Sequence, residues 1–539
     1  MQRLNKSIFL TLLTIVGLIG CGSGGGGGTG GGTVDTTAPQ VLNTSPADGA
    51  TGIAADQVVT VTFSEAINCA TVSTANVRLL EATNPIPVQV RCSGASVSLW
   101  PTEDMPTNTT LTATMDPSVR DLAGNTLADT HVWSFDMASW TRQLGSVEHE
   151  FAYATSTDAD GNVYMAGSTQ GALDGGTNAG FQDIFVIKYN ASGVQQWLRQ
   201  LGTAGDEQAR ALAVDADGNV YLTGYTEGAF DGQSNVGYQD IFIVKYDTNG
   251  MQQWLHQLGT STNDQARALT ADADGNVYLA GYTEGDLDGQ GNAGNEDIFV
   301  IKYDASGVQQ WIRQLGTAGI DAANGITADA DGNVYAAGET NYNLDSQTVA
   351  SGNQLFVIKY DASGAQQWVR QLGVSGGGAF ATTTITDSAG NVYAGGYTTG
   401  ALGDQTYVGS YDLFIIKYDT SGVQQWVRQL GTSTNEQARA LTADADGNVY
   451  AAGYTIGNLD GQGSAGAADI FITKYDGSGV QQWIHQIGTS GHDITNGLAA
   501  DTRGNLYIAG HTYGDLDGLS NAGLFDPYIV KYRMDGRKR

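Results

Sequence analysis

The sequence contains few cysteines, few prolines and few charged residues. Only 3 of its 539 residues are Cys, which excludes a disulfide-dense scaffold and argues against a zinc site built from cysteines. Its 25 basic residues face 56 acidic ones. The net charge of −31 argues against nucleic-acid binding through the phosphate backbone and against adhesion to anionic lipid through a basic patch. Hydrophobic residues still make up 41% of the chain, so it can build folded cores, and its length predicts several domains or one large repeat array.

The one long apolar run that stands out lies at the N-terminus. Arg3 and Lys6 precede apolar residues 8–19, which is the layout of a secretory signal and is too short for a stable membrane span. The run ends in Leu-Ile-Gly-Cys at Cys21, and this ending resembles the lipobox of bacterial lipoproteins. The resemblance implies that residues 1–20 are a signal peptide and that Cys21 carries a lipid. The alternative is a plain signal peptide whose apolar run happens to precede a cysteine.

The residues that follow Cys21 predict a tether. Residues 22–32 are almost all Gly, and we expect residues 21–37 to behave as a flexible coil because such a segment cannot pack. Gly22 rather than Asp follows the cysteine, which in enteric-type sorting favours the outer membrane. We therefore expect a membrane anchor at Cys21 in the bacterial outer membrane, facing either the periplasm or the cell surface.

The composition changes near residue 138. Seven of the eight prolines lie between Pro39 and Pro117, whereas seven of the nine tryptophans lie at or after Trp140. The change indicates two unlike domains and a short basic tail, at residues 38–137, 138–536 and 537–539.

Residues 38–137 predict a β-sandwich, because short alternating apolar runs are separated by turns. The runs lie at residues 58–63, 88–90, 97–100, 110–114 and 132–135. Two longer stretches resemble the bacterial Ig-like domain of surface-layer and exported proteins, namely TSPADGATGIAADQVVTVTFSEAI and DLAGNTLADTHVWSFD. The resemblance implies a spacer or adhesion module.

The two remaining cysteines fall inside this Ig-like segment. In an exported chain whose Cys21 is already used, a disulfide between Cys69 and Cys92, 23 residues apart, is the simplest pairing. Two unpaired core thiols are the alternative.

From residue 138 onwards the chain is a repeat array with a period of 57 residues and one step of 58. One full copy begins at Glu207 and predicts four strands, which we name A to D in chain order, at residues 211–214, 220–225, 241–246 and 252–258. Asp-Gly and Asn-Gly in the short turns tolerate the positive φ that tight hairpins need. Such self-similarity indicates a stacked or circular architecture. A tryptophan in the run W-x-[RH]-Q-[LI]-G marks each copy: Trp140, Trp197, Trp254, Trp311, Trp368, Trp426 and Trp483.

Two features favour a closed ring over an open solenoid. Strand C is almost continuously apolar, so both its faces must be covered, as they are in a β-propeller blade that packs between two neighbours. Residues 138–144 form a lone strand D, and the last copy ends after strand C, so the two fragments make one complete blade. We therefore expect seven blades, closed by pairing of the N- and C-terminal strands, which removes open sheet edges. Six or eight blades, or an open solenoid, are the alternatives.

The repeated motifs carry a second resemblance. D-x-D-G-N-V-Y-x-x-G, D-[IL]-F-[VI]-[IV]-K-Y and Q-Q-W resemble the repeats of bacterial seven-bladed β-propeller (SBBP) proteins, over residues 138–536. The predicted fold class is thus all-β, an Ig-like β-sandwich followed by a seven-bladed β-propeller.

The A-to-B turns offer a candidate calcium site. They carry Asp-x-Asp-Gly-Asn, and oxygen-rich loops that contain Gly can hold Ca²⁺. These loops are short and lack the later bidentate Glu of a helix-flanked calcium loop, so a plain hairpin turn is the favoured interpretation. We expect no cofactor apart from this possible structural Ca²⁺. The first acids of the motif are Asp158, Asp215, Asp272, Asp329 and Asp444.

Ligand binding is expected on the face that carries the long B-to-C and D-to-A loops, at or near the axis, because long loops on a rigid scaffold carry binding functions. A second acidic set in the B-to-C loops is either part of this ligand face or a solvated rim: Asp174, Asp231, Asp288, Asp345, Asp460 and Asp517.

Three arginines are the other candidates for this face. Arg210, Arg267 and Arg439 begin strand A in three copies and could ring the channel mouth, where they would bind a small anion or an acidic side chain. An acid lies three residues before each arginine, so local ion pairing is the favoured interpretation. These acids are Glu207, Asp264 and Glu436.

The sequence shows no nucleophile elbow, phosphate loop or carboxylate pair distinct from the repeat. His256 and His485 take the place of an Arg in strand D, which predicts surface substitutions, and His492 and His511 in the last copy are too few for a metal site. We therefore favour a non-enzymatic, monomeric, lipid-anchored protein in which an Ig-like spacer presents an acidic propeller for binding of a protein or glycan. The alternative is an exported propeller enzyme, a lyase or hydrolase that acts on glycans.

Overall fold

The computed structural model describes residues 35–53, 55, 57–102, 105–106, 109–344 and 352–538. These residues form β-strands and four single 3-10 turns, and the described part of the chain contains no α-helix. Among them, no helix is long and apolar enough to cross a membrane. The predicted signal peptide, the predicted lipidation site Cys21 and most of the predicted tether lie outside the described residues.

Two facing sheets make up the first domain. One has the strand order β1-β3-β7-β6 and the other β2-β9-β8-β4-β5. Between them lies one apolar core that includes Trp133 and Phe135. The strands and the 3-10 turn η1 are β1 Val41–Ser45, β2 Ala50–Ile53, β3 Val59–Phe63, η1 Cys69–Thr71, β4 Val77–Glu81, β5 Asn84–Pro85, β6 Val88–Ser93, β7 Ser96–Pro101, β8 Thr110–Met115 and β9 His131–Met137.

A disulfide joins Cys69 to Cys92, with the two Cα atoms 5.4 Å apart. The predicted pairing is confirmed. The bond fastens η1 to β6, and Cys92 packs against the edge of the core.

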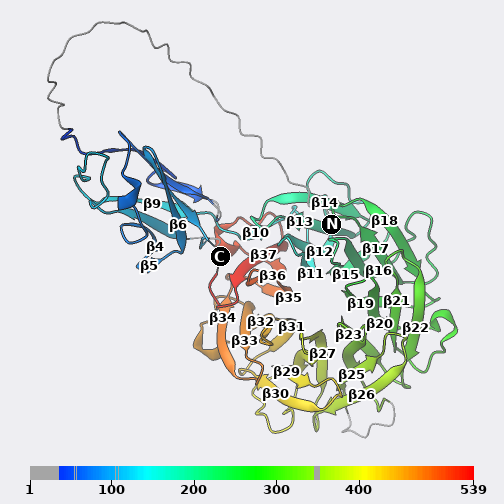
Figure 1. Cartoon of the computed structure of the whole chain (residues 1–539). Coiled ribbons are helices and arrows are strands. Elements are labelled where there is room, and N and C mark those ends of the chain that lie inside the picture. Colours follow the sequence, from blue (N-terminus) through cyan, green and yellow to red (C-terminus); the bar gives the residue numbers. More distant parts are fainter. Residues whose placement is uncertain are drawn as a thin grey trace, which may run out of the picture.

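Seven separate four-stranded antiparallel sheets follow residue 138. Figure 1 shows them arranged around one axis, with the first strand of each copy innermost. We number them one to seven by these inner strands, β11, β15, β19, β23, β27, β31 and β35. In sheets one to three the strands are β11 Glu150–Thr157, β12 Val163–Thr169, β13 Asp183–Tyr189, β14 Gln195–Leu201, β15 Glu207–Val214, β16 Val220–Thr226, β17 Asp240–Tyr246, β18 Gln252–Leu258, β19 Asp264–Ala271, β20 Val277–Thr283, β21 Asp297–Tyr303 and β22 Gln309–Leu315.

The remaining sheets follow the same order from the inner strand outwards. Their strands are β23 Asp321–Ala328, β24 Val334–Thr340, β25 Gln354–Tyr360, β26 Gln366–Gly373, β27 Ala379–Thr386, β28 Val392–Thr398, β29 Asp412–Tyr418, β30 Gln424–Leu430, β31 Glu436–Ala443, β32 Val449–Thr455, β33 Asp469–Tyr475, β34 Gln481–Ile487, β35 Asp493–Ala500, β36 Asn505–Thr512 and β37 Asp526–Arg533. Three 3-10 turns lie in B-to-C loops: η2 Leu287–Gly289, η3 Leu459–Gly461 and η4 Leu516–Gly518.

The fourth strand of sheet seven comes from the start of the array. β10, Arg142–Gln143, pairs antiparallel with β37, so that Arg142 lies opposite Ile529. Trp140 donates its indole N–H to Ala191 O of sheet one at 3.0 Å, just as Trp197 donates to Thr248 O of sheet two at 3.1 Å. The segment before sheet one therefore makes the contacts of an ordinary strand D. Each inner strand also contacts the inner strands on both sides, including β11 with β35.

The middle strands of each sheet are buried on both faces. All seven residues of β16 and of β17 are buried. One apolar cluster combines Tyr221 and Ile243 of sheet two with Leu279 and Phe299 of sheet three. The packing between neighbouring sheets thus explains why strand C is apolar throughout.

The A-to-B turn of every sheet contains the same hydrogen-bond network. In sheet two, Asp215 accepts the backbone N–H groups of Asp217 and Asn219 at 3.0 and 2.8 Å, the Asn219 amide at 2.8 Å and the Tyr221 hydroxyl at 3.0 Å. The two copies that depart from the full motif keep this first acid, as Asp387 and Asp501, with the same partners. The motif therefore builds a hairpin turn in all seven sheets.

Candidate functional site at the axis

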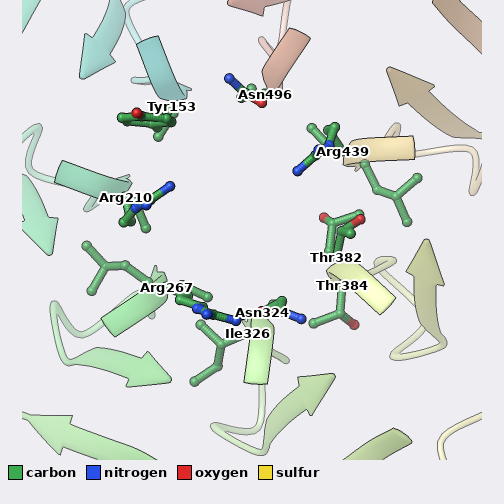
Figure 2. A pocket seen from close by; sticks show the side chains of 18 of the residues that line it. Tyr153, Arg210, Arg267, Asn324, Ile326, Thr382, Thr384, Arg439 and Asn496 are labelled. Atoms are coloured by element: carbon green, nitrogen blue, oxygen red, sulfur yellow. Dashed lines mark hydrogen bonds between the residues drawn. The ribbon is translucent and has the colours of Figure 1, made fainter. Parts of the chain in front are cut away.

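The inner strands are longer than predicted and contain a bulge. β15 begins at Glu207 rather than at residue 211, and Arg210 is the extra residue between Ala209, which pairs with Gly224, and Ala211, which pairs with Thr223. A Cβ on Gly224 would lie 1.8 Å from Gln208 O, so this glycine makes room for the bulge. A β-bulge re-aims the side chain that it carries. Here it directs Arg210 towards the axis, as Figure 2 shows.

The same bulge occurs in all seven inner strands. Its residues project into one central cavity of about 630 Å³ (Figure 2). We call them the axial ring. In contrast to the turn motif, they differ from sheet to sheet, and in order they are Tyr153, Arg210, Arg267, Asn324, Thr382, Arg439 and Asn496.

Several members of the axial ring also tie neighbouring sheets together. Arg267 donates to Asn324 Oδ1 at 2.8 Å. The side chains of Asn324, Thr382 and Asn496 donate to backbone carbonyls of the next sheet at 3.0, 2.6 and 3.0 Å. These four residues contribute to the packing around the axis as well as to the cavity wall.

Arg210 and Arg439 differ from the rest of the ring. Their Nε atoms are buried and have no hydrogen-bond partner among the described residues. All three ring arginines lie over tyrosine rings: Arg210 is 4.8 Å from the centre of Tyr153, Arg267 is 4.5 Å from that of Tyr282, and Arg439 is 5.6 Å from that of Tyr454. Cation–π contacts of this kind orient a guanidinium without using its hydrogen-bonding capacity.

The cavity wall contains one carboxylate, Glu339. It lies where sheets two, three, five and six carry a tyrosine. Burial raises the pKa of Glu339, nearby Arg267 lowers it, and Glu296 raises it again. Arg267 thus faces two carboxylates, those of Glu339 and Glu296.

The sector between sheets seven and one is aromatic. His511 is buried and contacts Phe151 edge-on, with ring centres 5.0 Å apart, and Phe525 in the same way at 5.3 Å. Burial, together with the charge of Arg439, lowers the pKa of His511 to about 4. His511 is therefore neutral at physiological pH and has a packing role beside Asn496, whose amide nitrogen lies 3.4 Å from its Nδ1.

The predicted ion pairs of the ring arginines are wrong. Glu207 is fully buried and accepts hydrogen bonds from Thr203 N and Oγ1 at 2.6 and 2.5 Å and from Thr226 Oγ1 at 2.9 Å. Asp264 and Glu436 do the same in their sheets. The acid faces the neighbouring loop, whereas the bulge turns the arginine towards the axis, so the two side chains separate.

The acidic set of the B-to-C loops lies away from the axial cavity. These loops fold back over the outer strands: Leu173 N donates to Gln200 Oε1 at 3.1 Å, and Asp174 accepts from Gln195 Nε2 at 2.7 Å. Asp288 and Asp460 accept from the equivalent glutamines, and Asp231 is exposed. Asp517 accepts from Thr141 and pairs with Lys538. Asp345 lies outside the described residues.

The calcium candidates lie at the opposite end of the inner strands from the long loops. Each first acid, Asp158, Asp215, Asp272, Asp329 or Asp444, uses both carboxylate oxygens to accept protein N–H and O–H groups. A lysine ammonium lies 3.8 Å from Asp158 and from Asp444. The arrangement is that of a turn whose acid already has its partners.

The strand D histidines are half-buried rather than simple surface residues. His256 stacks on Tyr303 of the next sheet, with ring centres 5.7 Å apart, and His485 stacks on Tyr532 at 6.3 Å. They fill the junction between sheets that Arg occupies in the other copies.

The first domain contains an acidic cluster that sequence reasoning missed. Asp35, Glu65 and Asp121 bring one carboxylate oxygen each within 4.8 Å of the others. Burial and the two neighbouring carboxylates raise the pKa of Glu65. Asp121 is the buried member and accepts from Asn125 N and Nδ2, both at 2.8 Å.

Sequence reasoning found three of the seven axial-ring residues and missed Tyr153, Asn324, Thr382 and Asn496. One signal was available: when the repeats are aligned, the third residue after the first residue of strand A varies while its surroundings repeat. The variation alone does not show that this position lines a cavity, because the bulge that turns its side chain towards the axis is seen only in the structure.

Comparison with known proteins assigns both parts of the chain. A model described as a bacterial Ig-like domain matches residues 35–137. A model described as a beta-propeller repeat matches six times, at residues 196–231, 253–288, 310–345, 367–404, 425–460 and 482–517. The predicted all-β class with an Ig-like domain and propeller repeats is confirmed.

Two curated proteins are similar to this chain. Regulatory protein FlaEY of Caulobacter vibrioides is 25% identical over 398 residues, which cover 65% of this chain and 41% of that protein. An uncharacterized WD repeat-containing protein, L264 of Acanthamoeba polyphaga mimivirus, is 20% identical over 528 residues, 73% of this chain and 38% of that protein. The chain thus spans about two fifths of the length of these relatives.

A solved structure resembles the chain more distantly. The beta-propeller domain of the trilobed protease from Pyrococcus furiosus is 12% identical, covers 72% of this chain and 96% of its own, and has a TM-score of 0.36.

Proposed function

We propose that this chain, which consists of a bacterial Ig-like domain followed by beta-propeller repeats, is a non-enzymatic, exported binding protein. The Ig-like domain acts as a spacer, and the propeller binds a protein or glycan at the axial cavity. We further propose that Cys21 carries a lipid which anchors a monomer in the bacterial outer membrane, facing either the periplasm or the cell surface.

We also propose that the seven sheets are the blades of one closed propeller. The support is the pairing of β10 with β37 and the tie between sheets seven and one. Thr157 donates to Ala500 O at 2.9 Å, and Arg503 donates to Asp160 O at 2.7 Å. A closed ring leaves no open sheet edge and fixes the seven bulges around one cavity.

A single observation carries the binding function: the repeats depart from one another at the axial ring. Residues that a scaffold needs, such as Asp215 and Tyr221, have an equivalent in every sheet, whereas ring residues vary within one cavity (Figure 2). A cavity of about 630 Å³ lies in the size range of small-molecule and cofactor sites.

The character of the cavity wall favours binding over catalysis. A glycan hydrolase commonly needs two carboxylates flanking the scissile bond, and Glu339 is the one carboxylate in the described wall. We therefore propose ligand retention without bond cleavage.

The test is a binding screen of the purified full chain against glycan and protein arrays, with and without Ca²⁺. We expect at least one ligand that is bound by the full chain and by Arg78→Gln, a charge-matched control in the Ig-like domain, but not by Arg439→Gln. The bound ligand, recovered and analysed by mass spectrometry, should be intact. Cleavage of the ligand, or equal binding by Arg439→Gln, contradicts the proposal.

The anchor is tested separately. Cells that express the chain with an alkyne-labelled fatty acid should yield a labelled outer-membrane protein, and Cys21→Ser should remove the label. Secretion of an unlabelled wild-type protein contradicts lipid attachment and supports the plain signal peptide.

A further inference from the structure

We infer that the axial cavity binds an acidic oligosaccharide that carries at least two anionic groups, one held by Arg210 and one by Arg439. This inference rests on the proposed binding function and adds the chemical class of the ligand. It is carried by the charges, the unpartnered polar atoms and the positions of the ring side chains.

The cavity wall is cationic although the chain is strongly acidic. It contains three guanidinium groups and one carboxylate in a chain whose net charge is −31. Glu339 and Glu296 lie near Arg267, which leaves Arg210 and Arg439 as the uncompensated charges of the wall. The positive cavity attracts anions that are small enough to enter it, whereas the acidic surface around it repels acidic macromolecules.

Unpartnered donors indicate that a ligand completes the site. A buried N–H without an acceptor costs free energy, and native structures rarely tolerate it. The Nε atoms of Arg210 and Arg439 are both in this state. A carboxylate or sulfate oxygen would satisfy each of them and would form a charge-assisted hydrogen bond, which is stronger than a neutral one.

The positions of the two arginines require more than one anionic group. Arg210 belongs to sheet two and Arg439 to sheet six, and Figure 2 shows them entering the cavity from opposite sides. A single carboxylate that engages one guanidinium is thus turned away from the other. A chain of acidic sugar residues presents anionic groups at intervals and can reach both.

Neutral groups of the wall suit the hydroxyls of a sugar. Gln437, two residues from Arg439, is buried, and its Oε1 has no hydrogen-bond partner among the described residues, so it can accept a hydroxyl proton. Tyr153 lines the cavity beside Arg210, and its hydroxyl can hydrogen-bond a sugar hydroxyl. An inorganic anion would leave Gln437 and Tyr153 unused, and an apolar ligand would leave both arginines unsatisfied.

The experiment is titration calorimetry of the full chain with a trimer of galacturonic acid as the probe. The same trimer with methyl-esterified carboxyls is the neutral control, inorganic sulfate is the small-anion control, and an acidic peptide is the protein-like control. We expect the free acid to bind at least tenfold more tightly than each of the three, and its affinity to fall with added salt because the contacts are ionic.

Variants then locate the binding site. Arg210→Gln and Arg439→Gln should each weaken binding of the trimer by about tenfold, since each removes a charge-assisted hydrogen bond. Arg439→Lys keeps the charge but loses the planar guanidinium group with its several N–H donors, so it should retain part of the affinity. Arg78→Gln, at an exposed residue of the Ig-like domain, should retain all of it. Thermal unfolding of each variant checks that a lost affinity does not reflect a lost fold.

Three outcomes overturn the inference: equal affinity for the acid and its ester, tighter binding of sulfate or the acidic peptide, or full affinity in folded Arg210→Gln and Arg439→Gln. In each case the proposed binding function survives if the array screen has found another ligand that needs the axial ring. If the array ligand is cleaved, the non-enzymatic proposal fails while binding of the acidic trimer by the cavity still stands.

Discussion

The two ends of the inner strand show opposite behaviour across the seven repeats. At the A-to-B turn, every sheet has the same Asp–Asn–Tyr network, with bonds of 2.7 to 3.0 Å between the side chains. At the bulge, the residue changes from Tyr to Arg, Asn or Thr. The same strand thus leads into a turn whose acid the fold requires and contains a bulge whose residue can vary without loss of the fold.

This contrast separates structural repetition from a candidate binding site. The turn acid is held by four hydrogen bonds within its own hairpin, so any exchange leaves buried donors unsatisfied. The bulge residue projects into open space at the axis, where different side chains are tolerated. Positions that vary inside an otherwise repeated array therefore indicate the ligand site better than the many acids that repeat.

The largest effect is expected for Gly224→Ala, which acts on both features. The new Cβ would lie 1.8 Å from Gln208 O, so the bulge must open or the strands must part. We expect a loss of about 3 kcal/mol in the free energy of unfolding, together with weaker ligand binding because Arg210 is displaced. Chemical denaturation and calorimetry measure the two quantities.

Gly232→Ala serves as the control for Gly224→Ala. Gly232 lies in the long loop of the same sheet, and no atom lies within 4 Å of its would-be Cβ, although its φ is +76°. Its cost should be limited to backbone strain of about 1 kcal/mol. Equal losses for the two variants would show that the bulge does not depend on the glycine.

The next effect concerns the turn alone. Asp215→Ala removes the acceptor of four hydrogen bonds and should cost about 2 kcal/mol of stability. Asp217→Ala in the same turn should cost less than about 0.5 kcal/mol, because its side chain is exposed. Thermal unfolding of the pair decides whether the first acid is structural, and similar melting temperatures would contradict the network's role.

The third effect is a pH dependence of stability caused by His511, a residue that departs from the repeat. His511 stands where four sheets have Tyr, and its pKa is lowered to about 4 in the fold against about 6.5 in an unfolded chain. Below pH 6.5, His511 binds a proton in the unfolded chain but not in the folded chain. The free energy of unfolding therefore falls as the pH drops from 6.5 to about 4.

Measured relative to His511→Tyr, the wild type should lose about 2 kcal/mol between pH 7 and pH 4.5. The raised pKa values of buried acids such as Asp412 and Asp526 act in both proteins and cancel in the difference. Parallel pH profiles for the two proteins would mean that His511 is protonated in the fold.

The smallest effect is expected from removal of metal ions. Each turn acid already uses both carboxylate oxygens to accept N–H and O–H groups. EDTA should therefore leave the melting temperature unchanged, and added Ca²⁺ should not raise it. A rise in melting temperature with Ca²⁺ would show that a cation binds the folded state and would support a calcium site in the turns.

Much of the fold could be predicted from the sequence. The predicted strands B and D of the copy that starts at Glu207 match β16 and β18 to within one residue, and the disulfide and the Ig-like strand runs were found. The repeat makes such predictions strong, because the same alternation and the same turn residues recur in each copy. Strands β1, β2, β4 and β5 of the Ig-like domain were not predicted.

The candidate site was less predictable. Arg210 was placed at the start of strand A beside Glu207, and the acids of the B-to-C loops, such as Asp174, were left open between the ligand face and a solvated rim. The structure supplies what was missing in both cases: a one-residue bulge turns the arginine away from its acid, and a loop folded over the outer strand carries Asp174 away from the axis. Neither a bulge nor the path of a long loop leaves a clear periodic mark in a sequence.

The sequence by itself determined the period, the four strands of each copy, the turn network and the identity of the Ig-like domain, because these depend on residues that are near one another in the chain. Only the tertiary structure decided which side chains meet at the axis. Seven residues, each about one repeat apart, share a cavity because the sheets are arranged around one axis and each inner strand bulges at the same point. Their proximity is a property of the whole set of sheets, so it has no counterpart in any single repeat.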